Sequence, residues 1–213
     1  MFIVVKAQQY SLYGALIDQA YRLRKRVFHD RLGWSVAIDG DYERDKYDAL
    51  CPDYLMWCDG QANHLYGTLR LMPTTGPTLL FDVFRSTFAG TDLTASGICE
   101  GTRMCIDENA LARDHPDINR GRAFGLLLLA LCECGLANDI QTFVSNYEPP
   151  MARVYRRSGL AIRELGRADG FGKRAVCCGR FDVSDEVRVR MQQALGVKTP
   201  VYSGWPAMLS GSC

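Results

Sequence analysis

The chain has 213 residues, with 25 Lys and Arg against 24 Asp and Glu, a formal net charge of +1, and 47% hydrophobic residues. This length and composition are typical of one globular domain, and they exclude general disorder and disfavour a protein that coats nucleic acid by charge alone. No apolar run approaches the roughly 20 residues of a membrane span, and the N-terminal MFIVVKAQQY carries no cleavable leader pattern, so we expect a cytoplasmic location.

The first half of the chain is predicted to hold one helix and several strands. Apolar, β-branched residues predict a strand at Phe2–Val5, and apolar residues at helical spacing predict a helix from Ser11. From Phe28 to Leu50 this periodicity disappears, which predicts a long charged loop, and such loops in compact domains are usually functional or disordered. The remaining expected elements are strands at Tyr54–Cys58, Leu65–Leu71 and Ile98–Ile106 and a short helical stretch at Phe81–Phe88.

The second half is predicted to alternate helices with strands. The longest apolar run, Phe124–Leu136, predicts a buried helix that starts near Asn119, and Ser184 is expected to cap a last helix that ends near Leu195. A further helix is expected at Pro150–Ser158, and strands at Thr142–Ser145, Leu160–Leu165 and Ala175–Phe181. This order favours an α/β or α+β sandwich with a mixed central sheet, as a single domain over residues 1–200 with a loose tail at 201–213.

The cysteine count is high for such a chain and odd in number. Without a C-x-x-C motif, and with Cys132 and Cys134 two residues apart on a predicted helix, the pattern disfavours a metal site. We therefore predict no metal and reduced thiols that act as small buried hydrophobic residues. The nine are Cys51, Cys58, Cys99, Cys105, Cys132, Cys134, Cys177, Cys178 and Cys213.

A first candidate site lies in the end of the first helix and the loop after it. Aromatic residues alternate there with charged ones, and ring faces together with carboxylates suit a small cationic ligand. The alternative is a solvated acidic loop in which Trp34 fills part of the core. The residues in question are Arg24, Phe28, Trp34, Asp45 and Asp48.

A second candidate site consists of charged residues inside apolar strands. They are Arg70 in GTLRLMP, and Glu100 and Arg103 in CEGTRMCID. Regular alternation would place residue 103 on the face of 99, 101 and 105, and Glu100 with Thr102 on the other. Since charges in apolar strands are rarely buried unpaired, these residues either line a cleft or form a structural network of ion pairs.

Two basic features could meet an anionic partner. The segment NRGRAFG from Asn119 opens the long helix, where free backbone N–H groups can bind phosphate, although simple helix initiation is the more common explanation. It approximates the pyrophosphate loop of the acetyltransferase fold. From Arg153 to Arg174 there are seven basic residues against Glu164 and Asp169, a patch that suits an acidic partner unless it is only a solvated helix face.

Taken in order, these motifs resemble the LuxI-type acyl-homoserine lactone synthases, the autoinducer synthases of bacterial quorum sensing. Each motif is short, but their order and spacing together are specific. The matching residues are Arg24 and Phe28 in RLRKRVF, Trp34 in RLGW, Asp45 and Asp48 in ERDKYD, Arg70 in GTLRLMPTTGPTLL followed by Phe84, and Glu100, Arg103 and Asp107 in CEGTRMCID.

The resemblance implies an acetyltransferase-like (GNAT-like) fold and two substrates, S-adenosylmethionine and an acyl thioester, with no cofactor. The carboxylates and the rings of Phe28 and Trp34 would hold the cationic groups of S-adenosylmethionine, and Arg24 or Arg103 its carboxylate. In the first step the α-amine attacks the thioester carbonyl, with Glu100 as the candidate base unless it only forms an ion pair with an arginine. The carboxylate then closes the lactone and releases methylthioadenosine, a step that depends mainly on positioning.

The acyl side of the reaction is expected between the Thr142–Ser145 strand and the long apolar helix. By the resemblance, the hydroxyl of Thr142 would bond a 3-oxo group. The segment SNYEPPMARVYRRSG departs from the family because it is longer than usual and holds Tyr147, Pro149 and Pro150. The basic patch beyond Met151 suits an acidic acyl carrier protein, whereas the helix start keeps acyl-coenzyme A open.

Two other functions compete with this interpretation. A generic N-acyltransferase of the same fold would use acyl-coenzyme A and another amine, and would not need the aromatic and acidic loop between Phe28 and Asp48. A nucleic-acid-binding regulator would use the basic cluster Arg22–Arg31, but the acidic stretch beside it would repel phosphate. We expect neither nucleic acid nor a membrane as a partner.

Overall fold

The computed structural model describes residues 1–88, 90 and 92–204, which contain a mixed sheet of seven strands in the order β1-β4-β5-β6-β7-β9-β8. Neighbouring strands are antiparallel except for β6 and β7, which are parallel. The mixed sheet with flanking helices confirms the predicted sandwich. Its strands are β1 (Phe2–Val5), β4 (Asp53–Cys58), β5 (Leu65–Pro73), β6 (Ile98–Ile106), β7 (Thr142–Tyr147), β8 (Arg163–Ala168) and β9 (Val176–Asp182).

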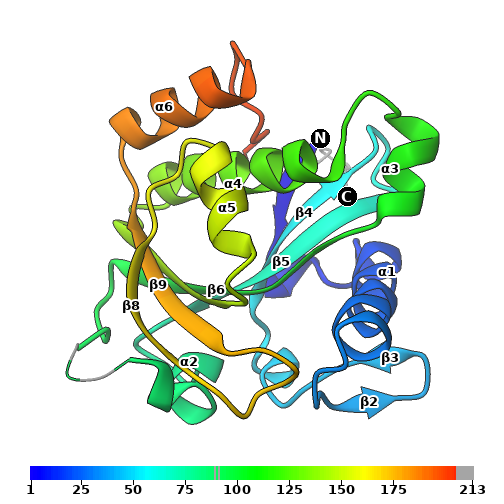
Figure 1. Cartoon of the computed structure of the whole chain (residues 1–213). Coiled ribbons are helices and arrows are strands. Elements are labelled where there is room, and N and C mark those ends of the chain that lie inside the picture. Colours follow the sequence, from blue (N-terminus) through cyan, green and yellow to red (C-terminus); the bar gives the residue numbers. More distant parts are fainter. Residues whose placement is uncertain (89, 91, 205–213) are drawn as a thin grey trace.

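The helices lie on both faces of the sheet (Figure 1). On one face are α4 (Arg120–Ala137), α5 (Met151–Arg157) and α6 (Asp185–Leu195). The other face carries α1 (Gly14–Arg24), which continues into a π-helical turn at Lys25–Arg31, and the small hairpin of β2 (Ile38–Asp39) and β3 (Tyr42–Glu43). The remaining helices are α2 (Leu79–Asp82), α3 (Glu108–Asp114) and 3-10 turns at Ala7–Gln9, Asp48–Leu50 and Arg85–Thr87.

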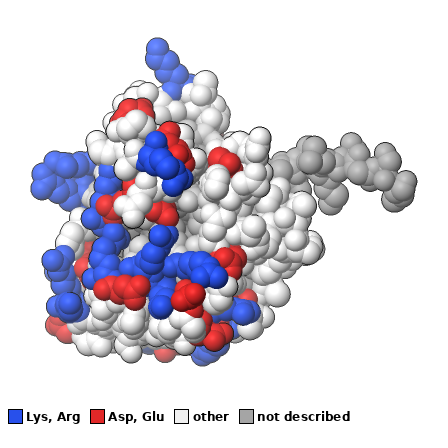
Figure 2. Space-filling view, turned by 90° about the vertical axis from the view of Figure 1, so that its right-hand side faces the viewer, with Lys and Arg blue, Asp and Glu red and all other residues white. Residues whose placement is uncertain are grey.

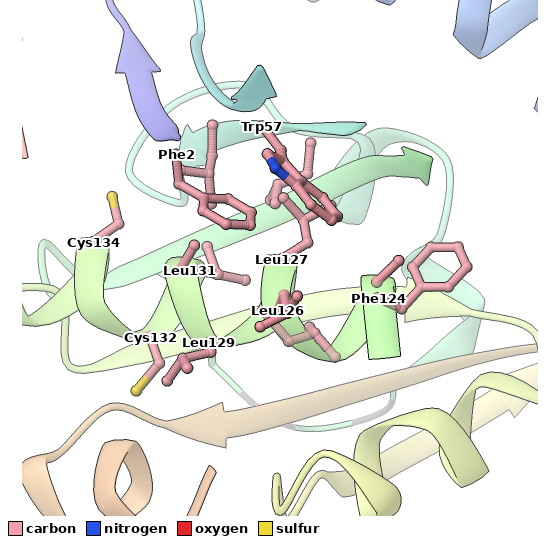
Figure 3. Packing of buried hydrophobic residues seen from close by; sticks show 14 of the residues in the cluster. Phe2, Trp57, Phe124, Leu126, Leu127, Leu129, Leu131, Cys132 and Cys134 are labelled. Carbon is pink, nitrogen blue, oxygen red and sulfur yellow. The ribbon is translucent and has the colours of Figure 1, made fainter. Parts of the chain in front are cut away.

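The core divides between the two faces because successive strand residues point to opposite sides. Phe2 and Val4 of β1 belong to the cluster under α4, whereas Ile3 and Val5 belong to the cluster under α1. Figure 3 shows the first cluster, in which Leu127 and Leu131 of α4 point toward the stacked rings of Phe2 and Trp57. Helix α4 is therefore the central element of one half of the molecule.

The sequence predicted helix α4 well. Asn119 caps it, with the Arg122 N–H donating to Asn119 Oδ1 at 3.0 Å, and four successive leucines, residues 126–129, are all buried. A helix that is apolar on every side must be covered on every side, and α4 lies between the sheet, α5 and α6. Among the described residues no helix is both long and apolar enough to cross a membrane.

Strands β6 and β7 pair over a short length only. Their register runs from Ile98 opposite Thr142 to Glu100 opposite Val144. One residue further, the backbones are no longer paired, and a side chain links the two strands instead: the Ser145 hydroxyl donates to the Gly101 carbonyl at 2.8 Å. The strands then diverge, and their separated ends leave room for a pocket.

Because of a bulge in β6, some of its side chains lie on a different face of the sheet from the one predicted. The register between β5 and β6 shifts between Thr68 and Arg70, and Arg103 has the left-handed φ of 55°, which is uncommon for a residue other than glycine. Cys99 consequently belongs to the cluster under α4, but Cys105 belongs to the cluster under α1. The prediction that residues 99, 101, 103 and 105 share a face is wrong because it assumed an unbroken alternation.

Several element boundaries also differ from the sequence prediction. Helix α1 begins at Gly14 rather than Ser11, β8 runs from Arg163 to Ala168 rather than from Leu160, and the expected loop after Phe28 contains a helical turn and a hairpin. Helix α3 was not predicted, although Asp107 before it accepts the N–H groups of Asn109 and Ala110 as an N-cap should.

The first part of the predicted loose tail is held in place. Glu133 of α4, buried, accepts the backbone N–H groups of Val201 and Tyr202 at 2.8 Å each, and the Ser203 N–H donates to the Phe2 carbonyl. These contacts connect the start of the predicted tail to α4 and β1. Residues 205–213 of the predicted tail lie outside the described residues.

Seven of the cysteines confirm the prediction of small buried hydrophobic residues. Burial raises the pKa of the Cys105 thiol to about 12, for example, so that it stays protonated at neutral pH. Cys51 is the exception, since it is exposed, and Cys213 lies outside the described residues. The buried ones are Cys58, Cys99, Cys105, Cys132, Cys134, Cys177 and Cys178.

Candidate functional site

A cavity of about 300 Å³ lies at the diverging ends of β6 and β7, below the π-helical turn. Its wall is largely apolar and aromatic, as in small-molecule sites, with a few charged groups. The aromatic residues are Phe28, Trp34, Phe84, Phe124, Tyr147 and Tyr155. The charged ones are Arg31, Arg103, Arg120, Arg174 and Glu148.

Three of the predicted aromatic residues meet on one side of this cavity. The ring centroids of Phe28 and Trp34 are 5.5 Å apart, and those of Trp34 and Phe84 are 6.5 Å apart. The loop between β8 and β9 covers the indole closely, because a Cβ at Gly172 would lie 3.2 Å from Trp34 Cδ1. Trp34 therefore has a fixed position in the cavity wall, where it also packs against the core.

Beside the cavity, six charged side chains from the end of α1, the loop after it and the strands form a closed ring. Each arginine contacts two carboxylates and each carboxylate contacts two arginines, so the formal charges sum to zero. Following the contacts, the ring runs Arg24, Glu43, Arg103, Asp45, Arg70, Asp48 and back to Arg24. We call this set the ion ring.

The ion ring is almost sealed from solvent and its geometry is strong. Arg24 donates to both oxygens of Asp48 at 2.8 Å, and Arg70 donates to both oxygens of Asp45 at 2.6 and 3.0 Å. The side chains of Arg24 and Arg70 are 1% and 0% exposed. Paired, charge-assisted hydrogen bonds of this kind are what makes buried charges tolerable.

The electrostatics of Asp48 show how the ring works. Burial alone would raise the pKa of this carboxyl, but hydrogen bonds and charge from Arg24, and charge from Arg70, hold it well below its usual range. The Tyr54 hydroxyl also donates to Asp48 Oδ1 at 2.6 Å. Asp48 is therefore ionised and its acceptors are occupied.

This arrangement separates the predicted binding residues into two groups. Phe28, Trp34 and Phe84 line the cavity, whereas Arg24 and the aspartates 45 and 48 do not. Of the strand charges, Arg70 and Arg103 belong to a structural network of ion pairs that includes loop residues as well, whereas Glu100 is not part of it. Asp45 and Asp48 stand as parts of the ion ring in this structure and do not face the cavity.

Arg103 belongs to both groups. Its Nε and Nη2 atoms contact Glu43, and Nη2 also contacts Asp45 at 3.2 Å, while the side chain lines the cavity. The guanidinium carbon lies 5.4 Å from the ring centroid of Phe28. The left-handed bulge places this arginine there, so it can offer its remaining N–H groups to an anion in the cavity.

Glu100 is placed differently from the expectation for a base that touches substrate. It is fully buried and does not line the cavity. Neither of its carboxylate oxygens has a hydrogen-bond partner among the described residues. Burial raises its pKa to about 7, although Arg70, Arg103 and the nearby backbone of Leu79 and Leu80 favour the charged form.

Thr142 does not reach the cavity. It lies at the start of β7, where its hydroxyl donates to Asp182 Oδ1 at 3.3 Å, and its neighbour on the same face, Val144, packs with the cluster away from α4. Ser145 points instead toward α4 and lines both the cavity and a small apolar gap between β7 and α4. The acyl side was expected in this gap, but the residues with hydroxyl groups that line it are Ser145 and Tyr155 and not Thr142.

Sequence reasoning missed the residues that the end of β7 contributes. Tyr147 and Glu148 line the cavity, and both belong to the segment SNYEPPMARVYRRSG that departs from the expected pattern. That departure was the available signal. A single glutamate before two prolines carries no motif, so its direction could not be predicted.

The basic residues fall into two settings. In the cluster Arg22–Arg31 each arginine pairs with an acidic side chain, as in the contacts of Arg26 with Asp107 and of Arg31 with Glu108. Figure 2 looks onto the side of α1 and α3 and shows Lys and Arg interleaved with Asp and Glu. A second cavity, of about 360 Å³, lies at the start of α4 and α5 and is lined by Arg122, Arg153 and Arg157.

The mixed sheet with its diverging parallel pair has the acetyltransferase-like fold, and the aromatic cavity lies at that divergence. The family model for autoinducer synthases matches residues 8–191. The chain therefore belongs to the autoinducer synthase family, and it is an enzyme, an acyltransferase.

Individual relatives agree with this assignment. A protein of Agrobacterium fabrum named acyl-homoserine-lactone synthase is 32% identical over 181 residues, 84% of each chain, and one of Rhizobium etli with the same name is 38% identical over 154 residues, 71% of this chain and 70% of its own. The solved structure of a CoA-dependent acyl-homoserine lactone synthase, BjaI, with SAM and isopentyl-CoA has a TM-score of 0.81 at 22% identity, over 96% of this chain and 92% of that one. That last likeness shows a shared fold.

Proposed function

We propose that this enzyme is an acyl-homoserine-lactone synthase that transfers an acyl group from a thioester to the amine of S-adenosylmethionine and then closes the lactone. The observation that carries the proposal is the aromatic cavity with Arg103 at its wall, which offers ring faces for a sulfonium and N–H donors for a carboxylate. The names of the relatives, and the S-adenosylmethionine and isopentyl-CoA in the BjaI structure, support the same pair of substrates.

In the first step, the α-amine attacks the thioester carbonyl, an N–C bond forms, the C–S bond breaks, and the amine loses a proton as the thiol leaves. Arg103 holds the methionine carboxylate, and the ion ring in turn holds Arg103, so that the amine keeps one orientation. Arg24, which the resemblance offered for that carboxylate, is fully used inside the ring.

Glu100 is the proposed base, and it acts through water because its carboxylate does not line the cavity. With a pKa of about 7 it is partly ionised at neutral pH, which suits a group that must accept a proton. In the wild-type enzyme kcat/KM should rise with pH through about 7. Glu100→Gln should lower turnover about 100-fold or more without changing the affinity for S-adenosylmethionine, and an unchanged turnover would remove Glu100 from this role.

In the second step, the methionine carboxylate attacks Cγ, an O–C bond forms, and the C–S bond to the sulfonium breaks with methylthioadenosine as the leaving group. No proton transfer is needed. The step therefore depends on the conformation of the bound substrate, whose carboxylate must reach its own Cγ. An aromatic wall that fixes the sulfonium and an arginine that fixes the carboxylate meet this need.

The acyl chain is proposed to enter the apolar gap between β7 and α4, which shares Met104, Ser145 and Tyr155 with the cavity. The donor is a phosphopantetheine thioester, and its anionic body lies on the arginines at the start of α4 and α5. Both acyl-coenzyme A and an acyl carrier protein present this chemistry, and a comparison of the two donors at equal acyl chain distinguishes them.

The direct test is incubation of the purified chain with S-adenosylmethionine and a panel of acyl-coenzyme A and acyl carrier protein thioesters. Mass spectrometry should detect an acyl-homoserine lactone and an equal amount of methylthioadenosine. If no donor releases methylthioadenosine while an acyl group is still transferred to another amine, the generic N-acyltransferase is the correct function.

A further inference from the structure

The charges on the cavity wall are unequal. Among the described lining residues there are four arginines, and the one carboxylate is that of Glu148. Asp45 and Asp48, whose charges the sequence suggested for a cationic ligand, are neutralised in the ion ring. A cation that enters this cavity therefore finds its opposite charge at Glu148.

Glu148 is held in a defined orientation. The Trp34 indole N–H donates to Glu148 Oε1 at 3.0 Å, and the backbone carbonyl of Glu148 accepts the Met151 N–H at 2.9 Å where α5 begins. The side chain is 14% exposed. The carboxylate thus lies at the edge of an indole that belongs to the aromatic wall.

The second oxygen of Glu148 is less engaged. It contacts Arg174, with Nη1 at 3.7 Å from Oε2, and that arginine side chain is 59% exposed. Such a long contact to an exposed side chain contributes little and is readily replaced. Glu148 therefore offers one oxygen and its charge to a ligand.

We propose that Glu148 supplies the countercharge for the sulfonium of S-adenosylmethionine, with Trp34 as the residue that orients it; this rests on the proposed function. A sulfonium has no N–H group, so charge and ring faces are what recognise it, and Glu148 beside Phe28, Trp34 and Phe84 provides both. The α-ammonium is the poorer partner, because a carboxylate beside it would keep it protonated and oppose its attack on the thioester.

The test compares two ligands that differ in the sulfonium. S-Adenosylhomocysteine retains the amine, the carboxylate and the adenosine of S-adenosylmethionine but has a neutral thioether. Isothermal titration of the full chain should show that Glu148→Gln, which keeps an acceptor for Trp34, weakens S-adenosylmethionine binding about tenfold and S-adenosylhomocysteine binding less than about twofold. Glu186→Gln on exposed α6 makes the same charge change away from the cavity and should alter neither.

Several results would overturn the assignment. They are an unchanged affinity for S-adenosylmethionine, an equal loss for both ligands, or a collapse of kcat at unchanged affinity, which would make Glu148 a base. Should Glu148→Gln fail to fold, Arg174→Gln gives an independent answer. Removing the competing cation should strengthen S-adenosylmethionine binding about twofold to threefold and leave S-adenosylhomocysteine unchanged, and the absence of this gain counts against the assignment.

Failure of this inference differs from failure of the proposed function. If the wild-type chain binds S-adenosylmethionine and makes lactone while Glu148→Gln binds both ligands like wild type, only the role of Glu148 is wrong. If the wild-type chain neither binds S-adenosylmethionine nor releases methylthioadenosine, the proposed function itself falls.

Discussion

Two neighbouring regions of this protein are built from the same residue types and behave in opposite ways. In the ion ring, three arginines and three carboxylates satisfy one another and are almost entirely buried. On the cavity wall, the side chain of Glu148 is 14% exposed, and its contact to the exposed Arg174 spans 3.7 Å. In the first region every charge is paired and only Arg103 also lines the cavity, whereas in the second Glu148 keeps a carboxylate oxygen that makes one long contact.

The difference lies in geometry and burial and not in composition. The ring forms because the loop after α1 folds back over the bulge of β6 and brings its acidic residues to Arg70 and Arg103. The wall forms where β6 and β7 separate, and three of its arginines, Arg31, Arg120 and Arg174, are exposed. Arg103 connects the two, which makes the ring the support of the binding site.

The strongest way to break the ring is to remove one arginine. Arg24→Met leaves Glu43 and Asp48 with an uncompensated buried charge, and breaking a buried pair in this way costs about 3–5 kcal/mol. Urea denaturation measures the loss of unfolding free energy. Arg22→Met, two residues away and exposed, should cost little, and equal effects of the two would show that the ring is not special.

Glu100 should make the free energy of unfolding depend on pH. Its pKa is raised from 4.5 to about 7 in the folded protein, so the folded state holds a proton that the unfolded chain releases. The stability from this group is complete below the unfolded pKa and is lost as pH rises through about 7, in total roughly 3 kcal/mol. Between about pH 5 and about pH 8, the free energy of unfolding should therefore fall less for Glu100→Gln than for the wild type. If the two proteins lose the same unfolding free energy over this range, the pKa of Glu100 is not raised by burial.

A substitution at Trp34 tests whether its N–H group orients Glu148 on the cavity wall. Trp34→Phe keeps an aromatic ring but removes the N–H that orients Glu148. KM for S-adenosylmethionine should rise about threefold to tenfold, while KM for the acyl donor and the denaturation midpoint stay near wild type. A large loss of stability would instead make this tryptophan a core residue, as the solvated-loop interpretation required.

Thr142 provides the smallest expected effect because it belongs to neither region. Thr142→Ala removes a hydroxyl that contacts Asp182 and not the cavity. We expect steady-state kinetics with 3-oxo and unsubstituted acyl donors to change less than about twofold. A selective loss with 3-oxo donors would restore the role that the resemblance suggested.

Much of the fold was predictable because the elements carry local signals. Strand β6 was predicted with its observed ends, and Asn119 and Ser184 mark the starts of α4 and α6. The signals fail where tertiary contacts decide the local structure. The hairpin of β2 and β3 contains two residues in each strand, and it places Glu43 against Arg24 and Arg103, residues far away in the sequence.

The site was predictable as a set of residues but not as an arrangement. Nothing in CEGTRMCID announces that Arg103 takes a left-handed backbone and leaves the regular alternation. Which carboxylates are used up by arginines depends on that bulge, and so does the distinction between ring and wall. Glu148 escaped prediction because its role arises from the divergence of β6 and β7 and from the position of Trp34.

The decisive measurement is a structure of the chain with bound S-adenosylmethionine. We expect the sulfonium in contact with Trp34 and the Glu148 carboxylate, the methionine carboxylate on Arg103, and all six members of the ion ring in their present pairing. A structure in which the ring opens and Asp45 or Asp48 contacts the ligand's cation would contradict this expectation.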